Sequence, residues 1–174
     1  MALAGRTTIS SGSDLAGGQL QETLDEVLQA LRNLLGPSLV AIVLYGSWAR
    51  GEARPGSDVD LFLVARNLPE DRFDRAVYLR QAVAGCGSLP VSILAKEPAQ
   101  FEAHFPPLYL DIGLDGIIID DSGGYMARKL ARIREIIDQA GLYRVRQEGE
   151  LMWWFRHQPK LHWAIEWDGF HEYD

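Results

Sequence analysis

The pattern of apolar and polar positions along the chain predicts helices that alternate with short buried strands. Apolar residues recur at three- and four-residue spacing over residues 20–35, which predicts an amphipathic helix. The Gly36-Pro37 pair ends that helix. Continuous apolar runs with β-branched members are typical of buried strands. They lie at residues 39–45, 59–64 and 91–95.

Further helices are expected between and after these strands, separated from them by glycine and proline. These helical segments lie at residues 47–50, 69–84, 97–104, 107–114 and 124–140. A short strand is expected at 116–120, and the runs at 142–146 and 151–155 are candidates for a pair of strands. Helices that separate strands predict an α/β or α+β domain with helices packed on a sheet.

Length and composition fit one domain with a small appendage. The chain has 174 residues, of which 47% are hydrophobic and 24% are charged, as in ordinary globular proteins. Residues 1–18 are small, polar and rich in glycine, so we expect a disordered tail there. The main domain is then expected at 19–121, with a helical and aromatic-rich C-terminal extension packed on it at 122–174.

Charge and cysteine content narrow the classes of partner. The net charge of -7 disfavours nucleic acid as a partner, although a metal ion can supply local positive charge at a phosphate site. One cysteine, Cys86, permits neither an intrachain disulfide nor a cysteine-based zinc site. No apolar run has the length of a membrane span, and the first residues lack the apolar core of a signal peptide. We therefore expect a cytoplasmic protein with no membrane partner.

The segment with the most chemistry joins the first two predicted strands. It reads GSWARG at residues 46–51 and SDVDL at residues 57–61. A glycine lets the backbone approach a phosphate closely, and a helix that starts there offers free N–H donors. Ser47 adds a hydroxyl donor. The end of the first strand therefore has the features of a phosphate cradle.

Asp58 and Asp60 complete this segment. Residues two apart in a strand project from the same face, so the two carboxylates are expected side by side, with Val59 and Leu61 pointing into the core. Adjacent carboxylates repel one another unless they share a cation, and magnesium prefers oxygen ligands. Such a pair beside a phosphate cradle suits metal-dependent phosphoryl or nucleotidyl transfer. Taken alone, the aspartate pair is also compatible with an acidic strand edge that has no function.

These residues resemble the DNA polymerase β-like nucleotidyltransferase superfamily, and in particular its minimal nucleotidyltransferases. The resemblance is carried by residues 39–64 and extends less strongly over 20–121. It implies a mixed sheet with helices on one side. It also implies transfer of a nucleoside monophosphate from a nucleoside triphosphate to an acceptor, with release of pyrophosphate. Some minimal nucleotidyltransferases are antitoxins that attach AMP to a HEPN-type partner protein.

The candidate site spans both halves of the motif. Under the resemblance, Asp58 and Asp60 are the catalytic residues and bind one or two magnesium ions. The residues expected to contact the nucleotide are Gly46, Ser47, Arg50, Arg54 and Ser57. A guanidinium group offers a planar fork of donors that suits phosphate oxygens. For the two arginines, the alternative is a charge on a loop exposed to solvent.

One position departs from the family pattern. The family carries a third carboxylate on a neighbouring strand, and the matching position here is Ser92. Serine is a poor magnesium ligand and is no base at neutral pH. Other acids that could replace it are Glu97, Asp111, Asp115 and Asp120. Without a replacement, the chain would be a slow enzyme or a non-catalytic module that regulates a partner protein; an RNA-modifying transferase is disfavoured by the acidic charge.

Two further groups of residues have open interpretations. The basic group could contact nucleotide, a nucleic-acid acceptor or an acidic partner, or it could be a solvated helix face. Its members are Arg128, Lys129, Arg132, Arg134, Arg144 and Arg146. The C-terminal aromatic group could stack on a base, but a packed core or an interface is the simpler interpretation. Its members are Trp153, Trp154, Phe155, Trp163 and Trp167.

Overall fold

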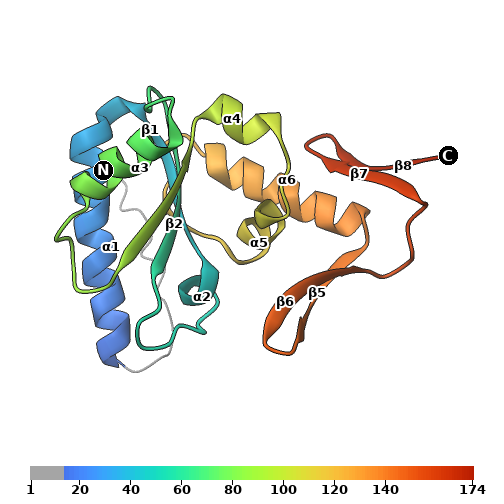
Figure 1. The fold of residues 1–174 in the computed structure, drawn as a ribbon, viewed down its shortest axis with the longest axis horizontal. Helices are drawn as coiled ribbons and strands as arrows, with labels where there is room; N and C mark the ends of the chain where they lie inside the picture. The colour runs from blue at the N-terminus through green and yellow to red at the C-terminus, as the bar shows by residue number, and fades with distance from the viewer. Residues whose placement is uncertain (1–13) are drawn as a thin grey trace.

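A computed structural model describes residues 14–174 as a four-stranded mixed sheet with helices on both faces, followed by two β-hairpins (Figure 1). The fold class predicted from the sequence is therefore confirmed. In chain order the elements are α1 (Asp14–Leu35), a 3₁₀ turn (Gly36–Ser38), β1 (Leu39–Tyr45), α2 (Gly46–Ala49), β2 (Val59–Ala65), α3 (Arg72–Ala82), β3 (Val91–Lys96), α4 (Pro98–Ala103), α5 (Leu108–Asp115), β4 (Ile117–Asp120), α6 (Tyr125–Gln139), β5 (Leu142–Gln147), β6 (Glu150–Phe155), β7 (His162–Glu166) and β8 (Gly169–Tyr173).

The N-terminal boundary differs from the expected one. Helix α1 begins at Asp14, so the last residues of the segment 1–18, expected to be a tail, belong to the first turns of this helix. Residues 1–13 lie outside the described part of the chain. None of the helices in residues 14–174 combines the length and the apolar character that a membrane span requires.

The sheet has the strand order β3-β2-β1-β4. Strand β1 is antiparallel to both of its neighbours, β2 and β4, whereas β2 runs parallel to β3. The parallel pair needs a crossover connection, which α3 provides. The central strands β1 and β2 are buried over nearly their whole length, which explains why the sequence shows continuous apolar runs there rather than alternation.

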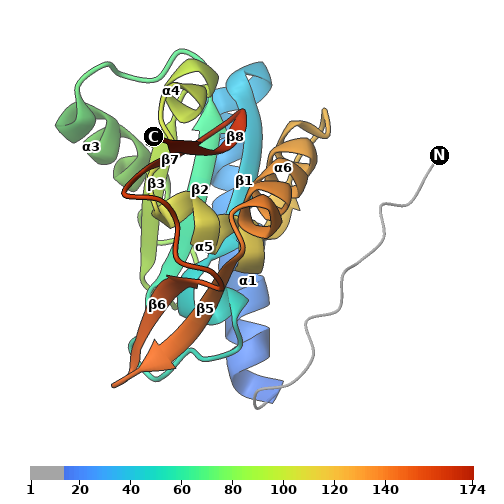
Figure 2. The same cartoon turned by 90° about the vertical axis from the view of Figure 1, so that its right-hand side faces the viewer.

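Helices cover both faces of the sheet, so the expectation of helices on one side is wrong. On one face, α1 and α3 pack on Ile42, Leu44, Leu61 and Leu63. On the other face, residues of α4, α5 and α6 pack on Val43, Phe62 and Val64. Figure 1 shows the sheet between these two helix layers, and Figure 2 views it from the side of α5 and the hairpins. Because successive side chains of a strand point to opposite faces, an apolar run in β1 and β2 requires both layers.

The C-terminal part of the chain extends the core on the α4–α5–α6 face of the sheet, here called the second core. The apolar side of α6 is buried there through Met126, Leu130, Ile133 and Ile137. Strands β5 and β6 pair as predicted, with Leu142 opposite Phe155. The hairpin β7–β8 was not predicted, although the dipeptide Asp168-Gly169, a hairpin signal, overlaps its two-residue turn Trp167-Asp168.

Trp153, Phe155 and Trp167 of the C-terminal aromatic group pack against the core, in line with the simpler interpretation, whereas Trp154 and Trp163 are exposed. Trp167 meets the rings of Phe101 and Phe105 edge-on, each at 5.0 Å between centroids. Its Nε1 donates to the backbone oxygens of Phe101 and His104 at 3.1 and 3.2 Å. Trp167 therefore attaches the last hairpin to α4 and to the loop that follows it.

Candidate active site

The glycine turn at the end of β1 lies against one of the two aspartates. Gly46 has a φ of 75°, a left-handed conformation that favours glycine. A Cβ atom placed on Gly46 would overlap the Oδ2 atom of Asp60. The register explains this contact, because Tyr45 at the end of β1 pairs with Asp60 near the start of β2. Any larger residue at position 46 would therefore displace the carboxylate.

The charges of Asp58 and Asp60 interact. Partial burial raises the pKa of Asp60 above its ordinary value, and the nearby charge of Asp58 raises this pKa further. The guanidinium of Arg50 acts in the opposite direction. Asp58 is exposed just before β2, whereas Val59 and Leu61 are buried, as the alternating pattern predicts. The charges of two carboxylates thus act on each other near the corner where the glycine turn ends β1.

Ser92 lies directly beside Asp60. In the parallel pair β2–β3, Asp60 is in register with Ser92, and Phe62 is in register with Leu94. Phe62 and Leu94 both belong to the core on the α4–α5–α6 side of the sheet, so Asp60 and Ser92 face that same side. The structure thus puts a hydroxyl group, not a third carboxylate, next to Asp60.

The loop between the motif halves lines a pocket of about 650 Å³. Its lining residues are Ser47, Arg50, Glu52, Arg54, Ser57, Arg146, Gly149 and Glu150. Four of the residues predicted to bind nucleotide therefore share one cavity. Gly46 and Asp58 adjoin it through their chain neighbours Ser47 and Ser57.

Ser57 also closes the turn that precedes the aspartates. Its backbone N–H donates to the oxygen of Arg54, and its Oγ accepts from the backbone N–H of Arg54, both at 2.9 Å. Trp48 donates its Nε1 to the Ser57 oxygen at 3.2 Å and packs against the core on the α1 side. These bonds hold the loop in one shape, which places the aspartates relative to the glycine turn.

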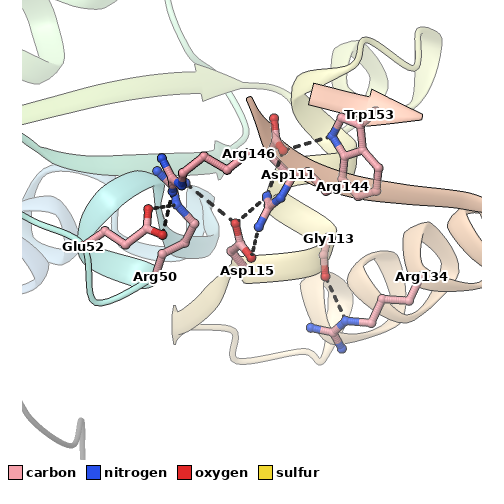
Figure 3. A network of polar contacts seen from close by, with 9 residues as sticks. All are labelled: Arg50, Glu52, Asp111, Gly113, Asp115, Arg134, Arg144, Arg146 and Trp153. Atoms are coloured by element: carbon pink, nitrogen blue, oxygen red, sulfur yellow. Dashed lines mark hydrogen bonds and ion pairs between the residues drawn. The ribbon is translucent and has the colours of Figure 1, made fainter. Parts of the chain in front are cut away.

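A chain of ion pairs connects the loop to the second core (Figure 3). Arg50 Nε donates to Oε2 of Glu52 at 2.8 Å, and its Nη1 lies 3.7 Å from Oδ2 of Asp115. Asp115 accepts two hydrogen bonds from Arg144, at 2.6 and 2.8 Å. Arg144 also donates to Asp111 at 2.9 Å. The loop, α5 and β5 are thus joined by alternating charges.

Comparison with known proteins identifies a family for this geometry. The sequence model of the family described as nucleotidyltransferase domain matches residues 24–119. The chain belongs to this family. A relative from Methanocaldococcus jannaschii, whose name proposes protein adenylyltransferase activity, is 37% identical over 122 residues, which cover 68% of this chain and 83% of the relative. The resemblance found from the motif is therefore confirmed.

Solved structures resemble this nucleotidyltransferase more distantly. A toxin–antitoxin complex crystallised with AMP-PNP has a TM-score of 0.47 and 17% identity, and the match covers 66% of this chain and 86% of that one. A complex of tri-AMPylated HEPN toxin with MNT antitoxin from Shewanella oneidensis has a TM-score of 0.45 and 16% identity, over 68% and 86% of the two chains. A Sulfolobus solfataricus protein, named as a proposed nucleotidyltransferase, has a TM-score of 0.45 and 18% identity, over 66% and 94%.

The four acids considered as replacements for Ser92 in this nucleotidyltransferase are all bound by other groups. Glu97 caps the N-terminus of α4 and accepts from the backbone N–H of Leu68 at 2.9 Å. Asp111 and Asp115 bind Arg144, as described above. Asp120 accepts from Arg32 at 2.7 Å. Each of these carboxylates thus has a structural role that competes with metal binding.

The basic group of the C-terminal extension is dispersed. Lys129 pairs with Glu102 at 2.9 Å, Arg132 donates to the oxygens of Trp167 and Asp168, and Arg134 donates to the oxygen of Gly113. These side chains join α6 to its neighbours, which favours a structural role over a single basic face. Within the part of the chain that the structure describes, Arg146 is the member of this group that lines the pocket.

Sequence reasoning missed the part of the pocket that the β5–β6 hairpin provides. Arg146 was noted as basic, but no spacing rule links it to Glu52, which it binds at 2.6 Å. Gly149 and Glu150 were not considered. The available signal was local: Glu148-Gly149 predicts a tight hairpin turn between two apolar runs. This signal predicts a hairpin, but not the surface against which it packs.

Proposed function

We propose that this nucleotidyltransferase uses Asp58 and Asp60 to bind magnesium and moves a nucleoside monophosphate from a nucleoside triphosphate to an acceptor. The observation that carries this proposal is the contact between Gly46 and Asp60. It brings a turn that accepts phosphate against a carboxylate whose neighbour is a second carboxylate. A phosphate and a cation can then be held together at one corner of the sheet.

The aspartate pair fits a hard divalent cation. Burial and the charge of Asp58 both raise the pKa of Asp60, so the ionised pair is unfavourable without a counter-charge. Magnesium prefers oxygen ligands and is commonly bound by one or two carboxylates together with phosphate oxygens of the substrate. Asp58 and Asp60 can supply the two carboxylates. When bound, the metal would neutralise charge on the phosphate that is transferred.

The other residues of the site bind and orient the triphosphate. The backbone N–H groups of the first turn of α2 have no acceptors within that helix and can donate to phosphate oxygens. Ser47 can donate its hydroxyl from the pocket wall. Arg50 and Arg54 carry the positive charge on the loop side of the pocket and can donate to phosphate oxygens in a planar fork.

For the acceptor, we propose a hydroxyl-bearing side chain of a partner protein. The support is the relative named for protein adenylyltransferase activity, which aligns over two thirds of this chain. A HEPN-type protein is the partner to test first, because the motif resembles that of minimal nucleotidyltransferases. A small hydroxylated molecule is the alternative acceptor. We place the reaction in the cytoplasm, where nucleoside triphosphates are abundant.

The test is transfer from ATP labelled at the α-phosphate, in the presence of magnesium and of a candidate acceptor. We expect the double variant Asp58→Asn/Asp60→Asn to lose both transfer and magnesium-dependent nucleotide binding, because its amide oxygens cannot replace two carboxylates. Asp138→Asn is the matched control, since Asp138 is exposed on α6. Wild-type affinity in the double variant would refute the metal site.

Ser92 favours a second candidate function, a nucleotide-binding module that regulates a partner with little or no transfer. A third carboxylate would help to activate the attacking hydroxyl, and the position next to Asp60 carries a hydroxyl instead. Labelled transfer to the partner that depends on Asp58 supports the enzyme. Partner binding that persists without nucleotide, together with no transfer above background, supports the module.

A further inference from the structure

The pocket beside the glycine turn has a second wall that comes from a distant part of the chain. Arg146, Gly149 and Glu150 of the β5–β6 hairpin line the same cavity as Arg50 and Arg54 of the loop. The family match ends at residue 119, so this wall lies outside the region that carries the family's sequence pattern. A ligand that fills the cavity has to touch both walls.

The turn of this hairpin has a defined shape. Glu148 and Gly149 have φ values of 52° and 92°, as the two central residues of a type I′ turn require. The strands pair in register up to Gln147 and Glu150 on either side of the turn. Nη1 of Arg146 donates to the oxygen of Gly149 at 2.8 Å, which holds the guanidinium against the turn.

Contacts outside the pocket hold the β5–β6 hairpin against the pocket. Arg144 lies two residues before Arg146 and therefore on the same face of β5. Its side chain is only 11% exposed, and it binds Asp111 and Asp115 of α5. Trp153, which pairs with Arg144 across the hairpin, donates its Nε1 to Asp111 at 3.0 Å. The contacts of Arg144 and Trp153 with α5 thus hold the hairpin that carries Arg146 beside the pocket (Figure 3).

Arg146 already holds an anion in the pocket, the carboxylate of Glu52. Nη2 of Arg146 donates to Oε1 of Glu52 at 2.6 Å, and Nε of Arg50 donates to Oε2 at 2.8 Å. These two bonds lower the pKa of Glu52. Two guanidinium groups around one oxyanion also form the arrangement in which arginines bind phosphate. The Glu52 carboxylate therefore marks a place that a phosphate oxygen can occupy.

We infer that Arg146 is a triphosphate-binding residue and that the β5–β6 hairpin is the outer wall of the nucleotide site. When nucleotide binds, Arg146 and Arg50 exchange the Glu52 carboxylate for oxygens of the β- and γ-phosphates. Glu52 can turn into solvent, because its side chain is already 43% exposed. This inference rests on the proposed function and adds to it a contact from outside the matched family region.

The test is calorimetric binding of ATP, AMP and inorganic tripolyphosphate, each with magnesium, to the 174-residue wild type and to Arg146→Ala. We expect the variant to bind ATP and tripolyphosphate about tenfold more weakly, because it loses a charge-assisted hydrogen bond to phosphate and the exchange with Glu52 offsets part of that loss. AMP, which lacks the outer phosphates, should bind both proteins equally. Arg146→Lys should recover only part of the affinity, because an ammonium lacks the fork.

Arg156→Ala is the matched control, because Arg156 follows β6 and stacks on Tyr143 instead of lining the pocket. Equal melting temperatures would show that both variants fold. If wild type and Arg146→Ala bind ATP equally, the inference is wrong while the proposed function stands. If ATP does not bind but tripolyphosphate binds and needs Arg146, the anion site is supported and the proposed function fails. If wild type binds neither, both are wrong.

Discussion

The motif loop (residues 46–58) and the β5–β6 hairpin face the same pocket, but they are held in place in different ways. The loop is positioned by neighbours in sequence: Gly46 lies against Asp60, and Ser57 bonds to Arg54. The hairpin is positioned by contacts between distant residues, above all Arg144 with Asp111 and Asp115. One wall is therefore specified by local geometry and the other by long-range charge pairs.

This difference separates two tasks. Groups that act on the transferred phosphate need a fixed mutual placement, which a glycine turn between adjacent strands supplies through short covalent connections. The wall that contacts the outer phosphates can belong to a less tightly connected element, because its function is binding. We therefore expect changes in the loop to affect transfer most, and changes in the hairpin to affect affinity or stability.

The largest expected effect is that of Gly46→Ala, which disrupts the loop from within. The added Cβ would overlap Oδ2 of Asp60, and a side chain in left-handed backbone costs about 1–2 kcal/mol. Because a displacement of roughly 1 Å in an active site can reduce the rate about 100-fold, we expect at least that loss of transfer. The measurement is single-turnover transfer from labelled ATP.

Gly51→Ala separates the two causes of that loss. Gly51 has a similar φ of 69°, yet among the described residues a Cβ there would meet no atom within 4 Å. It carries the backbone strain without the contact on Asp60, so we expect it to lose stability and keep most of its activity. Equal losses of activity in the two variants would show that the contact with Asp60 is unimportant.

The next largest effect is a gain. Ser92→Asp places a carboxylate beside Asp60, in register on β3. If the absent base limits the reaction, the rate should rise on the order of 100-fold. Ser92→Asn is the control, because it has a similar size and no charge. An increase in both variants, or in neither, would contradict the view that this position limits transfer.

Removing the charge that fixes the hairpin should affect stability. Arg144→Met leaves Asp111 and Asp115 without their partner, so we expect the free energy of unfolding to fall by about 2 kcal/mol. Urea unfolding measures this. Arg156→Met, at an exposed position after the same hairpin, should change it by less than about 0.5 kcal/mol. Similar losses in both would mean that the ion pairs do not hold the hairpin.

The smallest expected effect concerns the metal-free protein. Burial and Asp58 raise the pKa of Asp60, so between its ordinary and its raised pKa the folded state binds a proton that the unfolded state has lost. The contribution of Asp60 to wild-type stability should therefore rise as the pH falls through this window, opposite in sign to the contribution of Glu52, whose pKa is lowered. Asp60→Asn should remove that dependence and stabilise the protein at neutral pH by less than about 1 kcal/mol, since the carboxyl is partly exposed.

Thermal unfolding in chelator at several pH values measures this difference. The sign of this difference matters most. An ionised carboxylate that lowers the stability of the metal-free protein is expected at a site where a cation binds. A wild type that loses stability relative to Asp60→Asn as the pH falls through this window would show that Asp60 is stabilised as an anion without metal. A bound cation would then have no repulsion between Asp58 and Asp60 to relieve.

The loop could be predicted from the sequence because its structure depends on short-range rules. Every second residue of a strand lies on the same face, which predicts that Asp58 and Asp60 share one face. A glycine after an apolar run marks the turn. The apolar runs at 39–45 and 59–64 were found for the same reason. The expectation that helices cover one side of the sheet was wrong. The continuous apolar runs of β1 and β2 already imply that both faces of the sheet are covered.

The outer wall could not be predicted in this way. Arg146 meets Glu52 across 94 positions of sequence, and only the packing of α5 and α6 brings them together. The hairpin β7–β8 has a turn signal, but its attachment depends on Trp167, whose partners lie on α4 and the loop after it. Single-residue patterns carry no information about such distant pairs.

The burial of α6 has a practical consequence for anyone who designs shortened expression clones. The family match stops at residue 119, which invites a truncation there. However, Leu130, Ile133 and Ile137 of α6 fill the core over Val43 and Phe62. A clone that ends at 119 would expose the apolar surface of α5 and β1 that α6 covers, and should aggregate. Useful clones therefore have to extend at least through α6.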